Sequence, residues 1–389
     1  MAATIAGRAV GMKRSAIRAV FDAAEGKEGL IRLEIGEPSF RTPEHIIRAA
    51  DEAARNGFTR YGPNGGFLSL RRLLAEKIRT VDGYAAEPEQ VVATPGGMNA
   101  LFSIYLCLLN EGDEVLLPTP GFPNMDEMVR LLGGQPIFYT LTAEDGYLPN
   151  VSQIEALITS RTRAIFVNTP ANPTGAVFPG ALVEELVALV RRRDVWLIAD
   201  EVYDQMVLDD DREHVAAGRF DSDGHVVSVY SFSKVYAMTG WRLGYCVAPR
   251  ALADVLRKLQ EPQVSCPSSI SQKAAEAALL GDPGVVEDMR RQYVSRRDLA
   301  WDLANELGIK AFRTQGTFYM LLDIAQTGLS PRELTMRLLE NHGVTVAPGE
   351  VFGPGGHDVV RISLGVEPHQ IQEGLHRIAA GLRAETVTA

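Results

Sequence analysis

Three short strings in the sequence carry residues that could do covalent and proton-transfer chemistry. Lys234 ends the string Ser-Phe-Ser-Lys at residues 231–234, and Arg242 follows eight residues later. A lysine amine beside small hydroxyl residues can form a Schiff base with a carbonyl cofactor, and an arginine at that spacing can hold the cofactor's phosphate. Asp200 in Asp-Glu-Val-Tyr and Asn172 in Asn-Pro-Thr-Gly lie upstream. Together these residues predict one site for a phosphate-bearing cofactor.

The elements that must position these residues are strands of a mostly parallel sheet. Short apolar runs alternate with helix-like stretches, which is typical of an α/β sheet covered by helices on both faces. We expect strands at residues 90–94, 114–117, 136–139, 163–168, 195–200 and 226–231, and helices at residues 98–109 and 124–132. Asn168 and Asp200 close two of these strands, and residues 231–234 follow a third. Since ligands bind beyond the carboxyl ends of parallel strands, the candidates should lie together.

After about Gly281 the regular alternation of apolar strands and helices ends. A long polar-rich helix is expected at residues 285–307, followed by strand and helix patterns at residues 318–323, 331–341, 359–364 and 368–382. This mixture predicts a smaller α+β domain. We therefore expect a large domain over residues 31–282 and a small C-terminal domain over residues 283–389.

Composition and charge narrow the function classes. A net charge of −10 argues against a nucleic-acid surface, which needs clustered lysine and arginine. The longest apolar run, near residues 101–109, is too short to span a bilayer, and residues 1–14 lack the apolar stretch of a signal peptide. Cys107, Cys246 and Cys266 have neither metal-ligand nor disulfide-framework spacing. We expect a cytoplasmic protein that binds no metal, nucleic acid or membrane.

The order and spacing of these motifs resemble a known enzyme family. The strings at residues 168–175, 200–203 and 231–242 are similar to the pyridoxal 5'-phosphate (PLP) site of class I and II aminotransferases, which have the aspartate aminotransferase fold, or fold type I. The resemblance runs from about Ser15 to Arg361. It implies a large PLP-binding domain whose central sheet is sandwiched by helices. It also implies that residues 1–30 form an N-terminal arm that packs on the small domain.

The resemblance implies catalytic roles for Lys234, Asp200 and Tyr203 and a cofactor contact for Asn172. Lys234 would hold PLP as an internal aldimine and, once displaced by substrate, carry a proton between the substrate α-carbon and the cofactor. Asp200 would keep the pyridine nitrogen protonated, so that the ring stabilises negative charge on the substrate. Tyr203 and Asn172 would hydrogen-bond the cofactor's phenolic oxygen. Taken singly, each could be an ordinary surface, capping, turn or core residue.

Further residues match the family's phosphate and ring contacts. Gly96 and Gly97 lie between an expected strand and an expected helix. Glycines there let the backbone approach an anion, and the helix N-terminus supplies unpaired N–H groups. Phe122 matches the aromatic residue that stacks on the pyridine ring. The resemblance assigns the phosphate to Gly97, Met98, Ser231, Ser233 and Arg242, with Tyr61 reaching it from the neighbouring subunit. The implied assembly is a homodimer with shared active sites.

The substrate contacts follow from the same resemblance. Arg361 matches the arginine that binds the substrate α-carboxylate, for which a planar guanidinium suits better than an ammonium. Gly36 matches the glycine whose backbone lies along the substrate, beside Asn172. Ser15 and Ile17 resemble an N-terminal segment that folds over the site, so we expect a closing lid.

Met98 departs from the pattern of relatives that prefer dicarboxylic substrates. Bacterial members often have a lysine here, which meets the distal carboxylate, whereas a thioether cannot pair with a carboxylate. We therefore expect a neutral, aromatic or otherwise non-acidic amino donor. Glutamate could still bind if another arginine swings in, and Arg41 is a candidate for that role.

The reaction implied by the resemblance is ping-pong transfer of an amino group from an L-amino acid to a 2-oxo acid. The same site could instead run β-elimination, racemisation, oxidation or cyclisation in specialised biosynthesis, because the cofactor permits all of them. A regulatory protein is less consistent with the sequence, since too few residues precede Gly36 for a DNA-binding module. Ser231 and Lys234 also fit the Ser-x-x-Lys motif of penicillin-binding enzymes, but the companion motifs are missing.

Overall fold

The centre of the molecule is a seven-stranded, mostly parallel sheet. The computed structural model describes residues 4–12 and 16–386, and within them the sheet has the strand order β2-β8-β7-β6-β5-β3-β4. Its strands are β2 (Val91–Thr94), β3 (Glu114–Thr119), β4 (Gln135–Thr140), β5 (Thr162–Asn168), β6 (Trp196–Asp200), β7 (Val226–Ser231) and β8 (Gly244–Val247). Only β8 runs against its neighbours. The expected α/β class is confirmed, with each of the expected strands of the large part present.

Helices cover both faces of this sheet, and the strand residues alternate between two cores. In β5, Ile165 and Val167 pack in one cluster together with Leu186 of α8 (Gly180–Arg193). Phe166, which points the other way, packs with Ile104 of α5 (Gly97–Leu108) in the second cluster. Because successive side chains of a strand point to opposite faces, a strand buried on both sides must be apolar throughout.

The other helices around the sheet range in length from 4 residues in α9 to 15 in α10. They are α3 (Glu44–Arg55), α4 (Leu68–Lys77), α6 (Asn124–Leu131), α7 (Val151–Leu157), α9 (Phe232–Val235), α10 (Arg250–Val264) and α11 (Ser269–Leu280). No helix in the described residues is long and apolar enough to cross a membrane.

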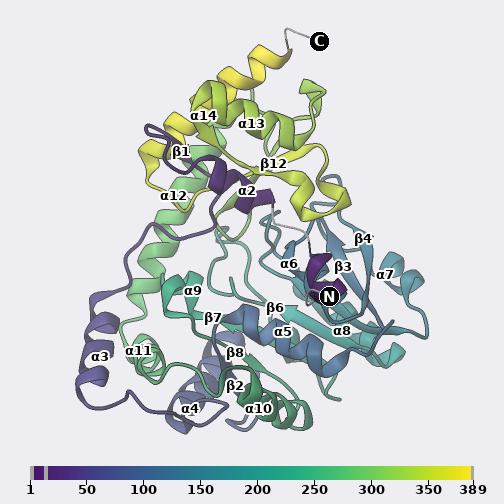
Figure 1. Ribbon diagram of the computed structural model, residues 1–389, viewed down its shortest axis with the longest axis vertical. Coiled ribbons are helices and arrows are strands. Elements are labelled where there is room, and N and C mark those ends of the chain that lie inside the picture. Colours follow the sequence, from purple (N-terminus) through teal and green to yellow (C-terminus); the bar gives the residue numbers. More distant parts are fainter. Residues whose placement is uncertain (1–3, 13–15, 387–389) are drawn as a thin grey trace.

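A smaller antiparallel sheet lies above the large one, with α13 and α14 beside it (Figure 1). The elements after residue 283 are α12 (Gly284–Glu306), β9 (Tyr319–Asp323), α13 (Pro331–His342), β10 (Val344–Thr345), β11 (Ala347–Pro348), β12 (Val359–Ser363) and α14 (Pro368–Thr386). The small sheet has the order β11-β12-β9. Its core also contains Tyr203 and Met206 from the large part. The exact domain limits, at residues 30 and 282, stay a prediction.

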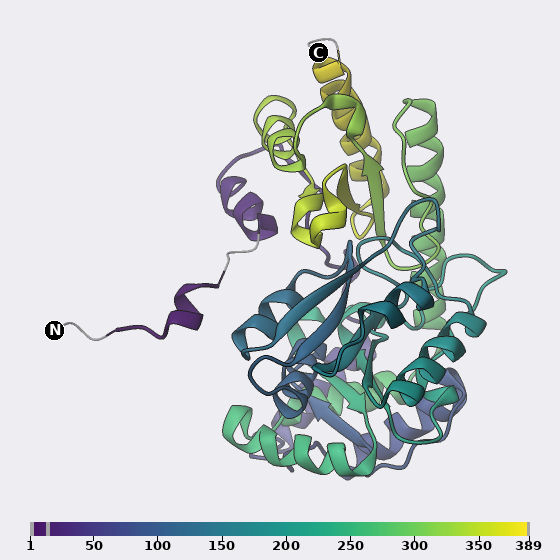
Figure 2. The same cartoon turned by 90° about the vertical axis from the view of Figure 1, so that its right-hand side faces the viewer.

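The N-terminal segment reaches the small part of the molecule. β1 (Ile31–Arg32) pairs in parallel with β10, and the Arg377 side chain of α14 donates a 2.9 Å hydrogen bond to the Gly29 carbonyl. α2 (Ala16–Ala23) contacts β11. α1 (Gly7–Val10) instead contacts α6 of the large part, and residues 4–12 extend to one side of the molecule in Figure 2.

Candidate active site

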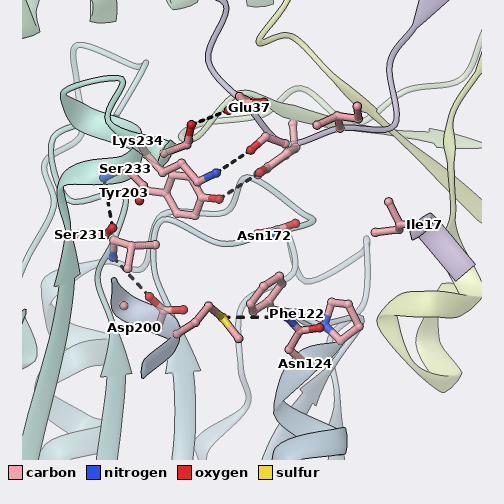
Figure 3. Close-up of a pocket in the computed structure, with 18 of the residues that line it drawn as sticks. Ile17, Glu37, Phe122, Asn124, Asn172, Asp200, Tyr203, Ser231, Ser233 and Lys234 are labelled. Carbon is pink, nitrogen blue, oxygen red and sulfur yellow. Dashed lines mark hydrogen bonds between the residues drawn. The ribbon is translucent and has the colours of Figure 1, made fainter. Parts of the chain in front are cut away.

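The carboxyl ends of three neighbouring strands form the floor of one pocket. Asn168 and Asp200 end β5 and β6 and are direct partners in the sheet, and Ser231 ends β7. The pocket has a volume of about 550 Å³ and also receives residues from α2, α5, α9 and β12. Figure 3 shows Lys234, Tyr203 and Asp200 on one side of it and Ile17 on the other. The strand-end positions expected from the sequence therefore converge.

Lys234 points into this pocket from the short helix α9. Ser231 caps that helix, because its Oγ accepts a 3.1 Å hydrogen bond from the Ser233 N–H. The Lys234 Nζ atom donates a 2.5 Å hydrogen bond to the Gly36 carbonyl, which lies 198 positions away in the sequence. The amine is thus held beside the chain segment expected to lie along the substrate.

Asp200 is a buried carboxyl group without a cation. Its exposed fraction is 4%, and no lysine, arginine or histidine in the described residues forms an ion pair with it. One weak 3.4 Å hydrogen bond reaches it from the Val202 N–H. Burial raises the pKa of Asp200 to about 7. A carboxyl group in this state is suited to a cationic ligand, which would offset its desolvation.

Arg361 lies in the middle of β12 and is 3% exposed. Its Nη1 donates to Asn172 Oδ1 at 2.9 Å and its Nη2 to the Glu34 carbonyl at 2.8 Å. Its Nε is buried without a hydrogen-bond partner, and burial lowers the pKa of the guanidinium. Since a guanidinium has five N–H donors, neutral acceptors leave its charge available for a carboxylate.

Tyr203 makes a contact that the sequence did not indicate. Its hydroxyl group lies 3.0 Å from the hydroxyl group of Tyr319, whose ring the Arg361 guanidinium covers at 4.2 Å. Burial, followed by the nearness of Tyr319, raises the pKa of Tyr203, so its phenol stays a hydrogen-bond donor at neutral pH. Tyr319 also lines the pocket.

The start of α5 and Arg242 form a cradle for an anion. Gly96 has a φ of 84°, and a Cβ atom built there would lie 2.6 Å from Arg242 Nη2. Arg242 donates a 2.7 Å hydrogen bond to the Thr239 carbonyl and forms no ion pair within the described residues. The free N–H groups of the helix start and this guanidinium fit a phosphate.

The remaining pocket wall is largely apolar. Phe122 and Met98 face the cavity with Leu101 and Ile17, and Asn124 lies below Phe122 in Figure 3. The Asn124 side-chain amide contacts the Met98 sulfur at 3.9 Å. Arg41, the candidate arginine should glutamate bind, is exposed and does not line the pocket.

One expected site residue among the described residues is not brought into this pocket. Tyr61 is 89% exposed and does not line it, so its role in a neighbouring subunit stays a prediction. The expectation for Ser15 cannot be compared, since Ser15 lies outside the described residues. The remaining members line the pocket, and they are Gly36, Gly97, Met98, Phe122, Asn172, Asp200, Tyr203, Ser231, Ser233, Lys234, Arg242, Arg361 and Ile17.

Sequence reasoning missed Arg18, Phe21 and Tyr319, which also line the pocket. A signal for Tyr319 exists only in the pairing of β9 with β12. Tyr319 lies two residues from Leu321, the partner of Arg361, so both side chains emerge on the same face of the small sheet.

The residues present fit PLP. The buried Asp200 carboxyl group could bind the cation of the pyridine ring, and the start of α5 with Arg242 could bind the phosphate. The Lys234 amine lies in the same cavity. No group of three or more metal-ligating side chains occurs in the part of the chain that the structure describes.

Known proteins are similar to this chain over nearly its whole length. The family model described as "Aminotransferase class I and II" matches residues 28–378. Aromatic-amino-acid aminotransferase 2 of Thermococcus litoralis is 37% identical over 372 residues, which are 95% of this chain and 96% of the relative. Aspartate aminotransferase of Pyrococcus abyssi is 36% identical over 377 residues, covering 96% and 97%. The solved structure of Thermus thermophilus aspartate aminotransferase with maleate superposes with a TM-score of 0.93 at 36% identity, covering 98% of this chain and 100% of that one.

Proposed function

Because the chain belongs to the class I and II aminotransferase family, we propose that it uses PLP in the pocket described above and takes its amino group from a non-acidic L-amino acid. As an aminotransferase, it moves an amino group from an amino acid to a 2-oxo acid. The observation that carries the proposal is Asp200, a buried carboxyl group without a cation that faces the same cavity as the Lys234 amine.

Each part of the cofactor has a matching group in the chain. Asp200 would bind the ring nitrogen, Tyr203 and Asn172 the phenolic oxygen, and Phe122 the ring face. The phosphate would be held by Gly97, Met98, Ser231, Ser233 and Arg242. When bound, PLP supplies an electron sink for negative charge that develops on the substrate α-carbon.

Lys234 would hold the cofactor through Nζ and then move the proton of the substrate α-carbon. Its present hydrogen bond to the Gly36 carbonyl shows that the amine reaches the segment along which the substrate would lie. A base contributes when it is within hydrogen-bond reach of the proton that it abstracts. The amine would serve both halves of a ping-pong cycle, once with the amino donor and once with the 2-oxo acid.

Arg361 would bind and orient the substrate. Its hydrogen-bond acceptors are the side-chain amide oxygen of Asn172 and the backbone carbonyl of Glu34, and neither carries a charge. The guanidinium can therefore form a charge-assisted pair with the α-carboxylate. That contact would place the α-carbon near Lys234. Ile17 on the opposite wall would then help to exclude water when the N-terminal segment closes over the site.

The apolar wall of the pocket is the reason for proposing a non-acidic amino donor. Met98, Leu101 and Phe122 offer no charge to a distal carboxylate, whereas they suit an aliphatic or aromatic side chain. One relative at 37% identity is named for aromatic amino acids and another at 36% for aspartate, so the apolar wall is the observation on which this choice rests. Elimination, racemisation, oxidation and cyclisation receive no support, because the relatives reported above are named as aminotransferases.

The proposal extends to a homodimer in the cytoplasm. Tyr61 is exposed in the single chain, as expected for a side chain that serves the site of a second copy. In that arrangement the partner's Tyr61 would reach the phosphate cradle at Arg242.

A visible absorption spectrum of the purified protein with PLP tests the proposed function. We expect a band of bound cofactor that bleaches with one apolar amino acid and returns when a 2-oxo acid is added. Lys234→Ala should show neither change, while Lys258→Ala, which alters an exposed lysine of α10, should behave as the wild type. A band that persists with every amino acid, or that bleaches with release of ammonia, would contradict transamination.

A further inference from the structure

Tyr319 is a polar pocket residue that the proposed function leaves without a role. It is the first residue of β9 and is 2% exposed, yet it lines the cavity. Its hydroxyl group lies 3.0 Å from that of Tyr203, the side chain assigned to the phenolic oxygen of the cofactor. No other hydrogen bond joins either hydroxyl group to the described residues.

The Tyr319 side chain is held in one place by its neighbours. The Arg361 guanidinium covers its ring at 4.2 Å, and the Phe318 ring lies 4.7 Å away, measured between centroids. A Cβ atom built at Gly36 would overlap the Tyr319 hydroxyl group, so the absence of a side chain at position 36 leaves room for that group. Because close packing surrounds the ring, its hydroxyl group has a fixed position beside Tyr203.

The Tyr203 ring is also fixed, but packing does not fix the direction of its hydroxyl hydrogen. Tyr203 is 3% exposed, and its ring meets the Tyr319 ring edge to face, with centroids 6.0 Å apart. Rotation about the phenolic C–O bond moves the hydrogen alone, and a hydroxyl hydrogen turns toward whichever acceptor suits it. The hydrogen-bond partners of Tyr203 therefore decide where its hydrogen points.

The number of available hydrogens decides which tyrosine donates when the cofactor is bound. In the cofactor-free chain either hydroxyl group could be the donor. Tyr203 has to donate to the phenolic oxygen of a bound cofactor, since a deprotonated oxygen has no hydrogen to offer. Its single hydrogen is then used, and the 3.0 Å contact remains a hydrogen bond only if Tyr319 donates to Tyr203.

We infer that Tyr319 is a positioning residue, which donates its hydroxyl hydrogen to Tyr203 and thereby directs the Tyr203 hydrogen toward the cofactor. The inference rests on the proposed function, in which Tyr203 binds the phenolic oxygen. A hydrogen bond donated to a negatively charged oxygen stabilises that charge. Tyr319 therefore lowers the pH at which the bound cofactor loses its proton, and it does so without touching the cofactor.

The test is a spectroscopic pH titration of the protein with bound PLP. The pH midpoint of the visible absorption band should rise by roughly 0.5 to 1 unit in Tyr319→Phe, the shift expected from the loss of one hydrogen bond. Tyr203→Phe, which removes the direct donor, should raise the midpoint further. The double variant should have the midpoint of Tyr203→Phe, because Tyr319 acts only through Tyr203.

Tyr293→Phe is the matched control, because it removes a phenolic hydroxyl group from the same buried cluster. The Tyr293 ring stacks on Phe318 with centroids 5.2 Å apart, but its hydroxyl group is buried without a hydrogen-bond partner, and Tyr293 does not line the pocket. Its midpoint should equal that of the wild type. An unchanged midpoint in Tyr319→Phe, or an equal rise in Tyr293→Phe, would overturn the inference.

The double variant also separates positioning from direct contact. If Tyr319→Phe raised the midpoint in the Tyr203→Phe background as much as in the wild type, Tyr319 would act on the cofactor itself, and the inference would be wrong. A wild type without a visible band of bound cofactor would overturn the proposed function together with the inference. A normal band whose midpoint does not respond to Tyr319→Phe would overturn the inference alone.

Steady-state kinetics give a second readout that a general loss of packing would not reproduce. Tyr319→Phe keeps the ring that Arg361 covers, so the KM of the amino donor should stay close to the wild-type value while the midpoint rises. Tyr319→Leu removes the ring as well and should raise the KM severalfold, because the guanidinium loses that support. Equal KM values in the two variants, both above that of the wild type, would contradict a role confined to Tyr203.

Discussion

At the scale of single residues, the proposed contact of Asp200 with the cofactor would link cofactor binding to the stability of the fold. The pKa of Asp200 is raised by burial to about 7 in the cofactor-free chain, above the value near 3.9 for an unfolded aspartate. The folded state then binds a proton that the unfolded state has released, so the free energy of unfolding falls as pH rises from about 4 to 7. A cation at this carboxyl group would remove that loss.

The first prediction therefore concerns Asp200→Asn. Without cofactor, the variant should be more stable than the wild type at pH 8, by on the order of 2–4 kcal/mol in the free energy of unfolding, with little difference at pH 4. With PLP, it should keep the cofactor but lose rate by orders of magnitude. Urea unfolding at both pH values checks the first part and steady-state rates the second. Equal pH profiles for the two proteins would contradict the assignment of a buried, unpaired acid.

Met98 is the residue at which a single substitution should change the preference between acidic and neutral amino donors. Met98→Lys would place an ammonium group at the start of α5, where the side chain lines the pocket. We expect kcat/KM for aspartate to rise roughly twofold to fivefold relative to that for a neutral donor. Met98→Leu, which preserves the apolar wall, is the control. If Met98→Lys left the preference for neutral donors unchanged, position 98 would not lie where the distal carboxylate of aspartate binds.

At the scale of elements, the turn between β2 and α5 depends on Gly96. Its φ of 84° is rare for other residues, and an added Cβ would lie 2.6 Å from Arg242 Nη2. Gly57 has a similar φ of 82° with nothing within 4 Å of a built Cβ. Alanine at Gly57 would strain the backbone alone, whereas alanine at Gly96 would also displace Arg242 from the anion cradle. Comparing the two substitutions therefore distinguishes these effects.

We predict that Gly96→Ala raises the Kd for PLP at least tenfold, because Arg242 must move from the cradle. Gly57→Ala should cost about 1 kcal/mol of stability and leave the Kd unchanged. Fluorescence titration with PLP gives the Kd, and urea unfolding gives the stability. A similar Kd for both variants would show that the phosphate does not sit at this turn.

A buried charge cluster connects α4 to the turn that follows β6. The Lys77 ammonium, at the end of α4, pairs with Asp204 and lies 2.8 Å from Asp82. All three side chains are at most 9% exposed. Asp204 directly follows Tyr203, so this cluster fixes the chain that carries the Tyr203 phenol.

Lys77→Met should destabilise the protein by about 3–5 kcal/mol, because it leaves two buried carboxylates without their cation. The double variant with Asp204→Asn should recover part of that loss, since one of the unpaired charges is gone. Urea unfolding of the wild type, the two single variants and the double variant measures the coupling between the two positions. Additive effects of the two changes would contradict a direct interaction.

At the scale of the whole molecule, the proposed dimer is tested by Tyr61. Tyr61→Phe should weaken PLP binding, and Lys234→Ala should abolish transfer. In a mixed dimer of the two variants, one site has Lys234 from one protomer and Tyr61 from the other, so its residues are native. Co-refolding the variants should therefore restore activity and tight binding at that site. No recovery in the mixture would mean that Tyr61 does not act across subunits.

The sequence alone indicated six of the seven strands of the large sheet, all except β8, and most of the residues that line the pocket. Strands such as 163–168 and 195–200 must be apolar throughout when both of their faces are covered, which makes them visible as short runs. Their carboxyl ends then fix where Asn168, Asp200 and Lys234 meet. The family resemblance added Arg361 and Gly36, which no local pattern connects with Lys234.

The tertiary structure decided the contacts between segments that are distant in the chain. Lys234 meets the Gly36 carbonyl across 198 positions, and Tyr319 joins Tyr203 and Arg361 only through the pairing of β9 with β12. Arg18 enters the pocket because α2 packs on the small part of the molecule, while Arg41 stays outside. Local propensity carries no information on such pairs, because their positions depend on how separate elements pack.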